Sequence, residues 1–184
     1  FPTKEDIIRV LDVTGYEKIR VKKSSIIKND KKTKIDLNAI AKGYGVDLVF
    51  NFLKNKGIDN LFVEIGGEVR FAGYNKNNRT WSVGIEDPIE INRQRKKLCA
   101  ALYLKNRAIA TSGNYRNIVD KNGVKLGHTI NPITGYPIQT DVLSVTVMSE
   151  QCMIADAWAT ALMAMNYEAG LEIINNNPDL DAIW

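Results

Sequence analysis

The sequence contains few of the residues that build the commonest catalytic and metal centres. It has one histidine, His128, and two cysteines, Cys99 and Cys152. No CxxC pair and no Cys/His cluster occurs, which excludes a zinc site of the usual kind. Two cysteines are also too few for a disulfide framework. A reaction that needs two histidines cannot come from this chain alone.

Long apolar runs are missing as well. No run reaches the roughly 18 residues needed to span a bilayer, and the opening residues FPTKED contain no basic segment followed by an apolar one, as a signal peptide would. The 184 residues are 45% hydrophobic and 25% charged, close to the average of globular proteins. We therefore expect one globular domain, and we exclude disorder, collagen and coiled coil.

A strong charge of one sign is absent too, because the formal net charge is only +4. The positive residues concentrate in two runs, 28–34 and 93–97. The simplest interpretation of both runs is a solvated loop, although a phosphate-rich ligand would also suit them. Neither run has the interleaved aromatic residues of a nucleic-acid groove, so we expect no nucleic-acid partner.

Apolar spacing predicts two strong helices. Residues 37–56 have apolar side chains at steps of three and four, which is the period of an amphipathic helix. Asp36 is in the position of its N-cap, and Gly57 is in the position of its C-terminal stop. Residues 150–165 are apolar on most sides, with Ser149 as the expected cap. This second helix should be largely buried.

The rest of the pattern is mainly that of strands, with turn signals such as Asn122-Gly123 between them. Shorter helices are expected over 4–12, with Thr3 as its N-cap, and over 168–175. The expected strands are 16–21, 61–65, 68–73, 80–86, 96–104, 107–111 and 142–148. Clustered strands with helices before and after them predict an α+β domain with a mainly antiparallel sheet, and not a regular βαβ alternation.

Two polar residues interrupt the second helix, Asp156 and Thr160. They are four residues apart and therefore lie on one face of the helix. A buried carboxylate is costly unless it is paired or bound to a metal. Asp156 could pair with a lysine or accept from a neighbouring backbone, with Thr160 bonded to its own helix. Alternatively, the two oxygen ligands suit a hard cation such as Mg²⁺.

The beginning of the first helix, DLNAIAKGYGVD (36–47), has features of an anion site. Free N–H groups and the helix dipole favour anions near Asp36 and Lys42, and Lys42 is a natural partner for phosphate. Gly43 and Gly45 are poor helix residues that permit the close approach of a ligand or of another backbone. A capped helix with small residues for packing explains the same pattern. Two other segments, EIGGE and TSGNY, give weaker signals of the same kind.

Six segments of the chain, taken together and in this order, resemble the ApbE family of flavin transferases. They are DLNAIAKGYGVD, VEIGGEVR, WSVGIEDP, ATSGNYRN, GHTINPITGYP and SVTVMSEQCMIADAWATALMAM. No single segment would be convincing, but six in register are specific. The resemblance covers nearly the whole chain, and it implies a single ApbE-like (T-fold-like) domain over residues 1–184.

The resemblance also implies an activity. Members of the family use Mg²⁺ to transfer FMN from FAD to a threonine hydroxyl of a partner flavoprotein, such as a subunit of a redox-driven ion pump, and they release AMP. Some relatives instead hydrolyse FAD to FMN and AMP. A non-catalytic FAD-binding protein and a protein-interaction domain without a ligand are the other interpretations of the sequence.

The site residues implied by the resemblance fall into three groups. The metal ligands are Asp156, Thr160 and the backbone carbonyl of Ala39. The contacts to the flavin nucleotide are Asp36, Lys42, His128 and Ile130. His128 is also the candidate for taking the proton from the attacking threonine hydroxyl, or for orienting that hydroxyl.

Full-length members of the family have an N-terminal portion before the region that matches here, and it contributes further FAD contacts. We therefore expect this chain to be an incomplete flavin transferase domain. Many relatives carry an export signal and a lipid-attachment cysteine in that portion. The resemblance thus implies a membrane-anchored lipoprotein outside the cytoplasm.

Overall fold

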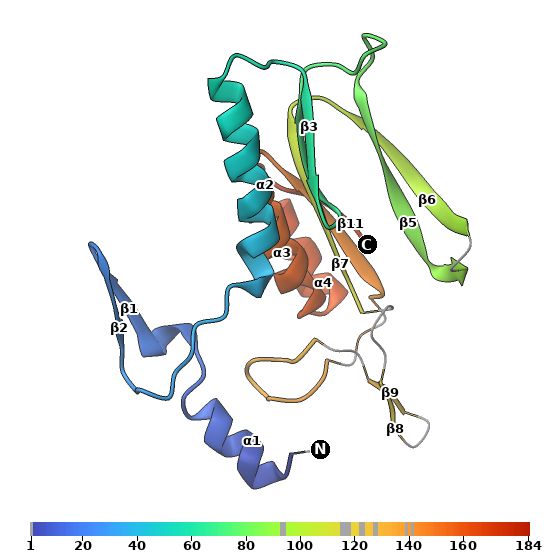
Figure 1. Cartoon of the computed structure of the whole chain (residues 1–184). Coiled ribbons are helices and arrows are strands. Elements are labelled where there is room, and N and C mark those ends of the chain that lie inside the picture. The colour runs from blue at the N-terminus through green and yellow to red at the C-terminus, as the bar shows by residue number, and fades with distance from the viewer. Residues whose placement is uncertain are drawn as a thin grey trace. The chain divides into compact units, whose positions relative to one another are not determined.

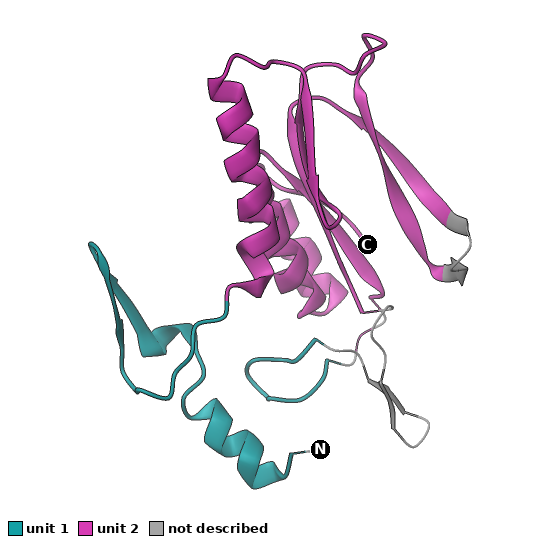
Figure 2. Cartoon of the chain, viewed as in Figure 1, with its two compact units in different colours: residues 1–36, 118–139 teal, residues 37–117, 140–184 magenta. Residues whose placement is uncertain are grey.

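The computed structural model describes residues 2–92, 95–114, 119–121, 124–126, 129–138, 140 and 142–184. The chain divides into two compact units, which Figure 2 shows in different colours. Unit 1 contains residues 1–36 and 118–139, and unit 2 contains residues 37–117 and 140–184. None of the helices in the described parts of the chain is both long and apolar enough to cross a bilayer.

Unit 1 is built from short elements. Helix α1 (Lys4–Leu11) begins at the predicted N-cap Thr3, which forms a capping box with Asp6. The strand expected over 16–21 begins instead with a 3-10 turn, Tyr16–Lys18, and becomes β1 only at Ile19–Lys22. Strand β1 pairs antiparallel with β2 (Ser25–Lys28), which the sequence did not indicate.

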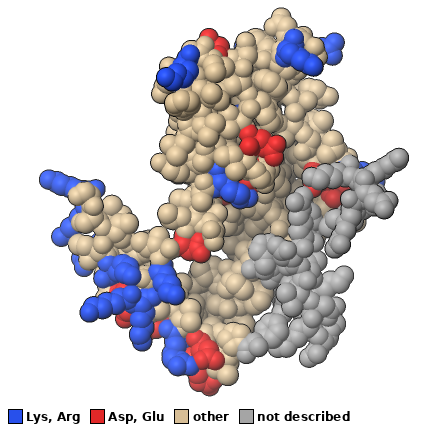
Figure 3. All heavy atoms as spheres, in the orientation of Figure 1, with Lys and Arg blue, Asp and Glu red and all other residues tan. Residues whose placement is uncertain are grey.

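Two further strands of unit 1, β8 (Val119–Lys121) and β9 (Val124–Leu126), pair antiparallel, and the predicted turn Asn122-Gly123 lies outside the described residues. On the face shown in Figure 3, Lys and Arg side chains gather over unit 1 with Asp and Glu side chains among them. The four lysines of the run 28–34 are all exposed. The basic run therefore presents its charges to solvent.

Unit 2 contains a five-stranded sheet, and the predicted antiparallel arrangement is confirmed. Its order is β11-β10-β7-β4-β3, and all four neighbouring pairs are antiparallel. The strands are β3 (Leu61–Ile65), β4 (Glu68–Ala72), β7 (Arg107–Gly113), β10 (Ser144–Ser149) and β11 (Asp181–Ile183). Strands β5 (Trp81–Asn92) and β6 (Arg95–Leu104) form a separate long hairpin.

Helices and hairpin cover opposite faces of this sheet (Figure 1). Helices α2 (Asn38–Asn55), α3 (Cys152–Met163) and α4 (Tyr167–Asn175) lie on one side. Because side chains alternate along a strand, Val69 and Phe71 of β4 face the hairpin while Ala72 faces α2. The α+β prediction is thus confirmed, with α3 buried as expected.

Two predicted helix caps are wrong. The N-cap residue of α2 is Leu37, with no side-chain cap, so Asp36 does not cap this helix. The N-cap residue of α3 is Gln151, also without a side-chain cap, and Ser149 instead bonds to the backbone of Gln151. In both cases the helix begins one or two residues later than the polar residue suggested. Helix α3 takes its cap from another element, as described below.

Candidate functional site

The centre of the candidate site is the carboxylate of Asp156 on α3. Asp156 is only 4% exposed, and its Oδ2 accepts a hydrogen bond of 2.9 Å from the backbone N–H of Gly43 on α2. Gly43 permits this approach because it has no side chain. A Cβ at this position would lie against the carbonyl oxygen of Cys152 and 2.8 Å from the Cβ of Asp156. At Gly43 the backbone of α2 therefore packs directly against α3.

This contact places Asp156 next to the first turn of α2. In a regular helix the N–H of residue 43 is directed at the carbonyl of residue 39, so the N–H that Asp156 binds lies beside the carbonyl of Ala39. Thr160 lies one turn after Asp156 on the same face of α3. Its hydroxyl is 3.3 Å from that of Ser112 on β7.

A second carboxylate, Glu68 at the start of β4, lies at the same end of α2. It forms an ion pair with Lys42. The side chain of Glu68 is 3% exposed and that of Lys42 is 49% exposed. The pair thus presents a cation at the surface and buries its counter-ion. The Oε2 atom of Glu68 has no hydrogen-bond partner among the described residues.

Burial dominates the electrostatics of both carboxylates. It raises the pKa of Asp156, against the opposing effects of the Gly43 N–H and of Lys42. It also raises the pKa of Glu68, although Lys42 acts in the opposite direction and Asp156 adds to the rise. Burial thus makes the charged form of each carboxylate more costly than in water, and a cation bound nearby would lower both pKa values again.

A cavity of about 430 Å³ opens beside Lys42 and Glu68. Gly66 and Gly67, both with positive φ, form the turn on its border. Its other lining residues come from β3, β4, the β5–β6 hairpin and β7: Phe62, Glu64, Val69, Ser82, Val83, Gly84, Ile85, Glu86, Thr111 and Gly113. Its size is that of a small-molecule site, and Lys42 is the group on its border that can bind a phosphate.

The structure thus brings together some of the sequence-predicted residues. Asp156, Thr160, Ala39 and Lys42 all lie on the facing helices of unit 2. Among the residues that the structure describes, no three His, Cys, Asp or Glu side chains form a group that could hold a metal ion. A cation here would need hydroxyl and carbonyl oxygens in addition to Asp156.

The other predicted contacts lie in unit 1. Asp36 borders a cavity formed within that unit. Ile130 is 49% exposed and forms an isolated antiparallel bridge with Pro137. His128 lies outside the described residues.

The sequence pointed to the segment EIGGE, but not to its last residue Glu68 as a member of the candidate site. Its partner Lys42 is 26 residues away, so no local spacing connects the two. The signal that could have found it is a carboxylate directly after two glycines at the start of a buried strand.

Comparisons with known proteins find a matching family and similar sequences and structures. The model of the family described as ApbE family matches residues 1–184. A relative from Vibrio cholerae named FAD:protein FMN transferase is 40% identical over 176 residues, which are 96% of this chain and 52% of the relative. One of the same name from Haemophilus influenzae is 35% identical over 180 residues, 96% of this chain and 51% of the relative.

Two solved structures are also similar. The flavin transferase ApbE from Vibrio cholerae superimposes with a TM-score of 0.86 at 38% identity, over 98% of this chain and 56% of that one. The apo form of the flavinyl transferase ApbE from Pseudomonas stutzeri gives a TM-score of 0.85 at 32% identity, over 98% and 54%. The chain spans about half the length of the curated relatives it matches.

Proposed function

The chain belongs to the ApbE family, and on that premise we propose that it carries the phosphate-binding and metal-binding part of an FAD:protein FMN transferase. In the proposed reaction a threonine hydroxyl of a partner flavoprotein attacks the phosphorus atom of the FMN half of FAD. A new phosphoester bond forms, the bond to AMP breaks, and the hydroxyl proton passes to a base.

One observation carries the proposal: the buried carboxylate of Asp156 is held against the first turn of α2 by the Gly43 N–H. Burying a charged carboxylate is energetically costly. The hydrogen bond from Gly43 does not fully offset this cost, because the pKa of Asp156 is still raised. A buried, energetically unfavourable carboxylate near a lysine that borders a ligand-sized cavity is typical of a functional site.

The residues present fit a Mg²⁺ ion. Asp156, the Thr160 hydroxyl and the Ala39 carbonyl would hold it, since Mg²⁺ prefers oxygen ligands and completes its shell with water and substrate phosphates. When bound, Mg²⁺ supplies charge neutralisation at the FAD pyrophosphate. Phosphoryl transfer depends mainly on positioning and on such neutralisation.

The chain's own residues would do the rest. Lys42, whose ammonium is fixed at the border of the cavity by Glu68, would bind a phosphate oxygen of FAD. Asp36 and Ile130 would contact the flavin nucleotide, and His128 would take or orient the proton of the attacking hydroxyl. These three roles rest on the family resemblance.

We extend the proposal to the whole protein in the same way. Residues 1–184 would belong to one flavin transferase domain. The acceptor would be a flavoprotein with a target threonine, such as a subunit of a redox-driven ion pump. The protein would act outside the cytoplasmic membrane as an anchored lipoprotein.

The test is incubation of the chain with FAD and Mg²⁺, with and without an acceptor flavoprotein. Transfer predicts AMP release together with an increase in acceptor mass by one FMN moiety. AMP release without an acceptor would indicate FAD hydrolysis instead. Binding of FAD with no AMP in either arm would reduce the function to flavin binding.

A further inference from the structure

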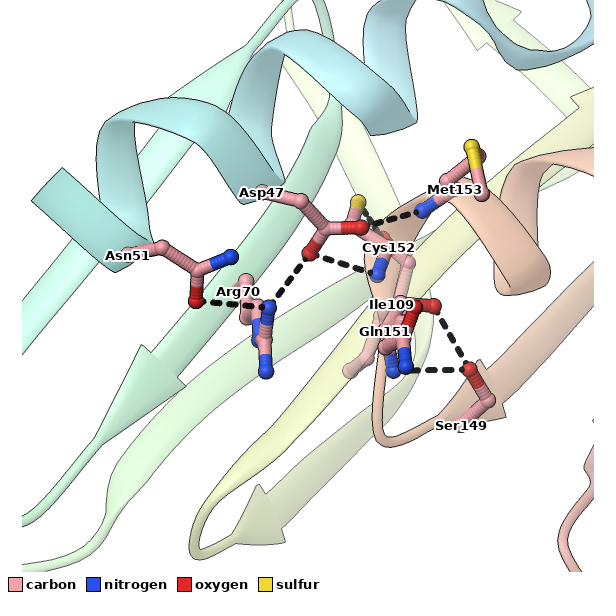
Figure 4. A network of polar contacts seen from close by, with 8 residues as sticks. All are labelled: Asp47, Asn51, Arg70, Ile109, Ser149, Gln151, Cys152 and Met153. Atoms are coloured by element: carbon pink, nitrogen blue, oxygen red, sulfur yellow. Dashed lines mark hydrogen bonds and ion pairs between the residues drawn. The ribbon is translucent and has the colours of Figure 1, made fainter.

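Helix α3 begins without a cap of its own, and a carboxylate from α2 fills that role. The N-cap residue Gln151 makes no side-chain cap. Instead, Asp47 Oδ1 accepts a hydrogen bond of 3.0 Å from the N–H of Cys152, and Oδ2 accepts one of 2.9 Å from that of Met153. Figure 4 shows the carboxylate of Asp47 directed at these two amides. The unpaired N–H groups and the dipole of a helix N-terminus favour such an anion.

Arg70 of β4 holds Asp47 in this position. Its Nη1 atom donates to Asp47 Oδ1 at 2.7 Å, and both side chains are largely buried. The guanidinium also lies over the ring of Phe50, 4.2 Å from the ring centroid. A bonded and stacked guanidinium has little freedom to move, so it fixes the carboxylate in turn.

Helix α2 therefore forms hydrogen bonds to α3 at two points, which are one helical turn apart on each helix. Asp47 binds the amides of Cys152 and Met153, and Gly43 binds the carboxylate of Asp156. A helix turns by about 100° per residue, so a small rotation or shift of α3 would move Asp156 away from the first turn of α2. The first contact thus sets the geometry of the second.

We propose that Asp47, fixed by Arg70, is a positioning residue for the metal and phosphate site. It holds α3 at the depth and rotation at which Asp156 and Thr160 face the carbonyl of Ala39. This inference rests on the proposed function of that site. Asp47 touches neither Asp156 nor the cavity beside Lys42 in any contact described here.

The test variant is Asp47→Asn, which keeps the shape of the side chain but loses its charge and one of its two acceptors. Substitutions in residues that orient a metal ligand typically cost 10–100-fold in metal affinity. We therefore expect Mn²⁺, used as a probe in electron paramagnetic resonance, to bind at least about 10-fold more weakly. The Mg²⁺ concentration for half-maximal AMP release should rise by a similar factor.

A third readout needs neither metal nor substrate. The exchange rate of the Gly43 amide hydrogen reports on its bond to Asp156, and this rate should rise at least about 10-fold in Asp47→Asn. Amides of the central strand β10, such as that of Val147, serve as the internal reference and should change much less.

Two control variants separate positioning from loss of stability. Asp59→Asn removes another carboxylate paired with α2, through Lys54, at the far end of the helix from the site. Phe71→Leu loosens the core between the sheet and the hairpin, on the face away from α3. Both should leave the half-maximal Mg²⁺ concentration unchanged, even where the melting temperature falls.

The outcomes decide between the two proposals. If the wild-type chain binds no Mn²⁺ and releases no AMP, the proposed function fails, and the Gly43 amide alone still decides whether Asp47 positions α3. If the wild-type chain does both, but Asp47→Asn lowers only the maximal rate and the melting temperature, the positioning role is overturned. An unchanged Gly43 exchange rate would overturn it in either case.

Discussion

Asp156 shows at the scale of a single residue how the candidate site weakens the fold. Its carboxylate is buried on an apolar helix, and burial raises its pKa. Among the described residues, the backbone N–H of Gly43 donates a hydrogen bond to it. A residue chosen only for stability at this position would be uncharged.

This conflict predicts the behaviour of Asp156→Asn. The amide oxygen can still accept from Gly43, while the cost of the buried charge disappears. In the absence of divalent metal at pH 7 we expect a melting temperature about 2–4 °C higher than that of the wild type. Mg²⁺-dependent AMP release should fall by about 100-fold or more, because a direct ligand is lost. Calorimetry in EDTA and an AMP assay measure the two effects, and unchanged AMP release would reject the metal role of Asp156.

The raised pKa values also predict how stability depends on pH. A carboxyl whose pKa is higher in the folded chain contributes stability that is complete below its unfolded value of about 4, and this stability is lost as the pH rises through the folded value. Asp156 and Glu68 both belong to this class. In EDTA, the difference in melting temperature between Asp156→Asn and the wild type should therefore grow from pH 4 to pH 7. Saturating Mg²⁺ should reverse its sign at pH 7, and a difference independent of pH would contradict the argument.

Sequence reasoning found Asp156 and Thr160 because their spacing on an apolar helix is local information. It did not find Glu68 or Asp47, whose partners are 26 and 105 residues away along the chain. Asp47 is one of several polar residues on a half-exposed helix, and only the fold shows that it caps α3. The wrong cap at Ser149 has the same origin, because a cap supplied by a distant residue leaves no local signal.

At the scale of elements, the close contact between α2 and α3 depends on Gly43. A side chain there would lie against the backbone of Cys152 and against Asp156. The sequence suggested that Gly43 and Gly45 permit close approach, but it could not say of what, or that the two glycines differ.

That difference gives a matched pair of variants. Gly43→Ala should destabilise the chain by about 1–3 kcal/mol, the usual cost of forcing an extra methyl group into a packed contact. It should also weaken metal binding, since α3 must move. Gly45→Ala meets only the Cδ1 atom of Ile65, at 3.4 Å, and should be neutral or stabilising by up to about 1 kcal/mol because alanine favours helix. Denaturant unfolding measures both changes, and equal effects would refute the special role of Gly43.

Most of the element pattern could be predicted, because α2, α3 and the four longer strands of the sheet, β3, β4, β7 and β10, have strong apolar patterns. The elements that the sequence did not predict are short. Strands β2 and β11 have four and three residues, too few for a clear period. Residues 16–18, which were expected to begin the first strand, form a 3-10 turn that follows Gly15, whose φ is 134°. Local turns of this kind are decided by packing within the unit.

At the scale of the whole molecule, α2 has an apolar stripe that the described part of the chain leaves exposed. Tyr44, Leu48 and Phe52 follow one another at steps of four and are 51%, 52% and 60% exposed. They lie on the side of the helix opposite Val46 and Phe50, which pack against the sheet. The curated relatives that match this chain are about twice as long, so in them about half of the protein is additional to what is seen here.

We expect this 184-residue chain to bind FAD more weakly than a full-length relative, such as the enzyme from Vibrio cholerae. Contacts made by the additional half would be missing, while the entropic cost of fixing the ligand stays the same. If the missing contacts include two hydrogen bonds to FAD, at about 1 kcal/mol each, the affinity falls by about 30-fold. Fluorescence quenching of FAD compares the two proteins.

The exposed stripe should in addition cause reversible self-association, detectable by sedimentation and reduced in Phe52→Glu. The Phe52→Glu variant also serves as the control for the affinity measurement, because it separates weak binding from blocking of the site by self-association. Equal FAD affinity of the chain and the full-length relative would show that the matched half contains the whole flavin site.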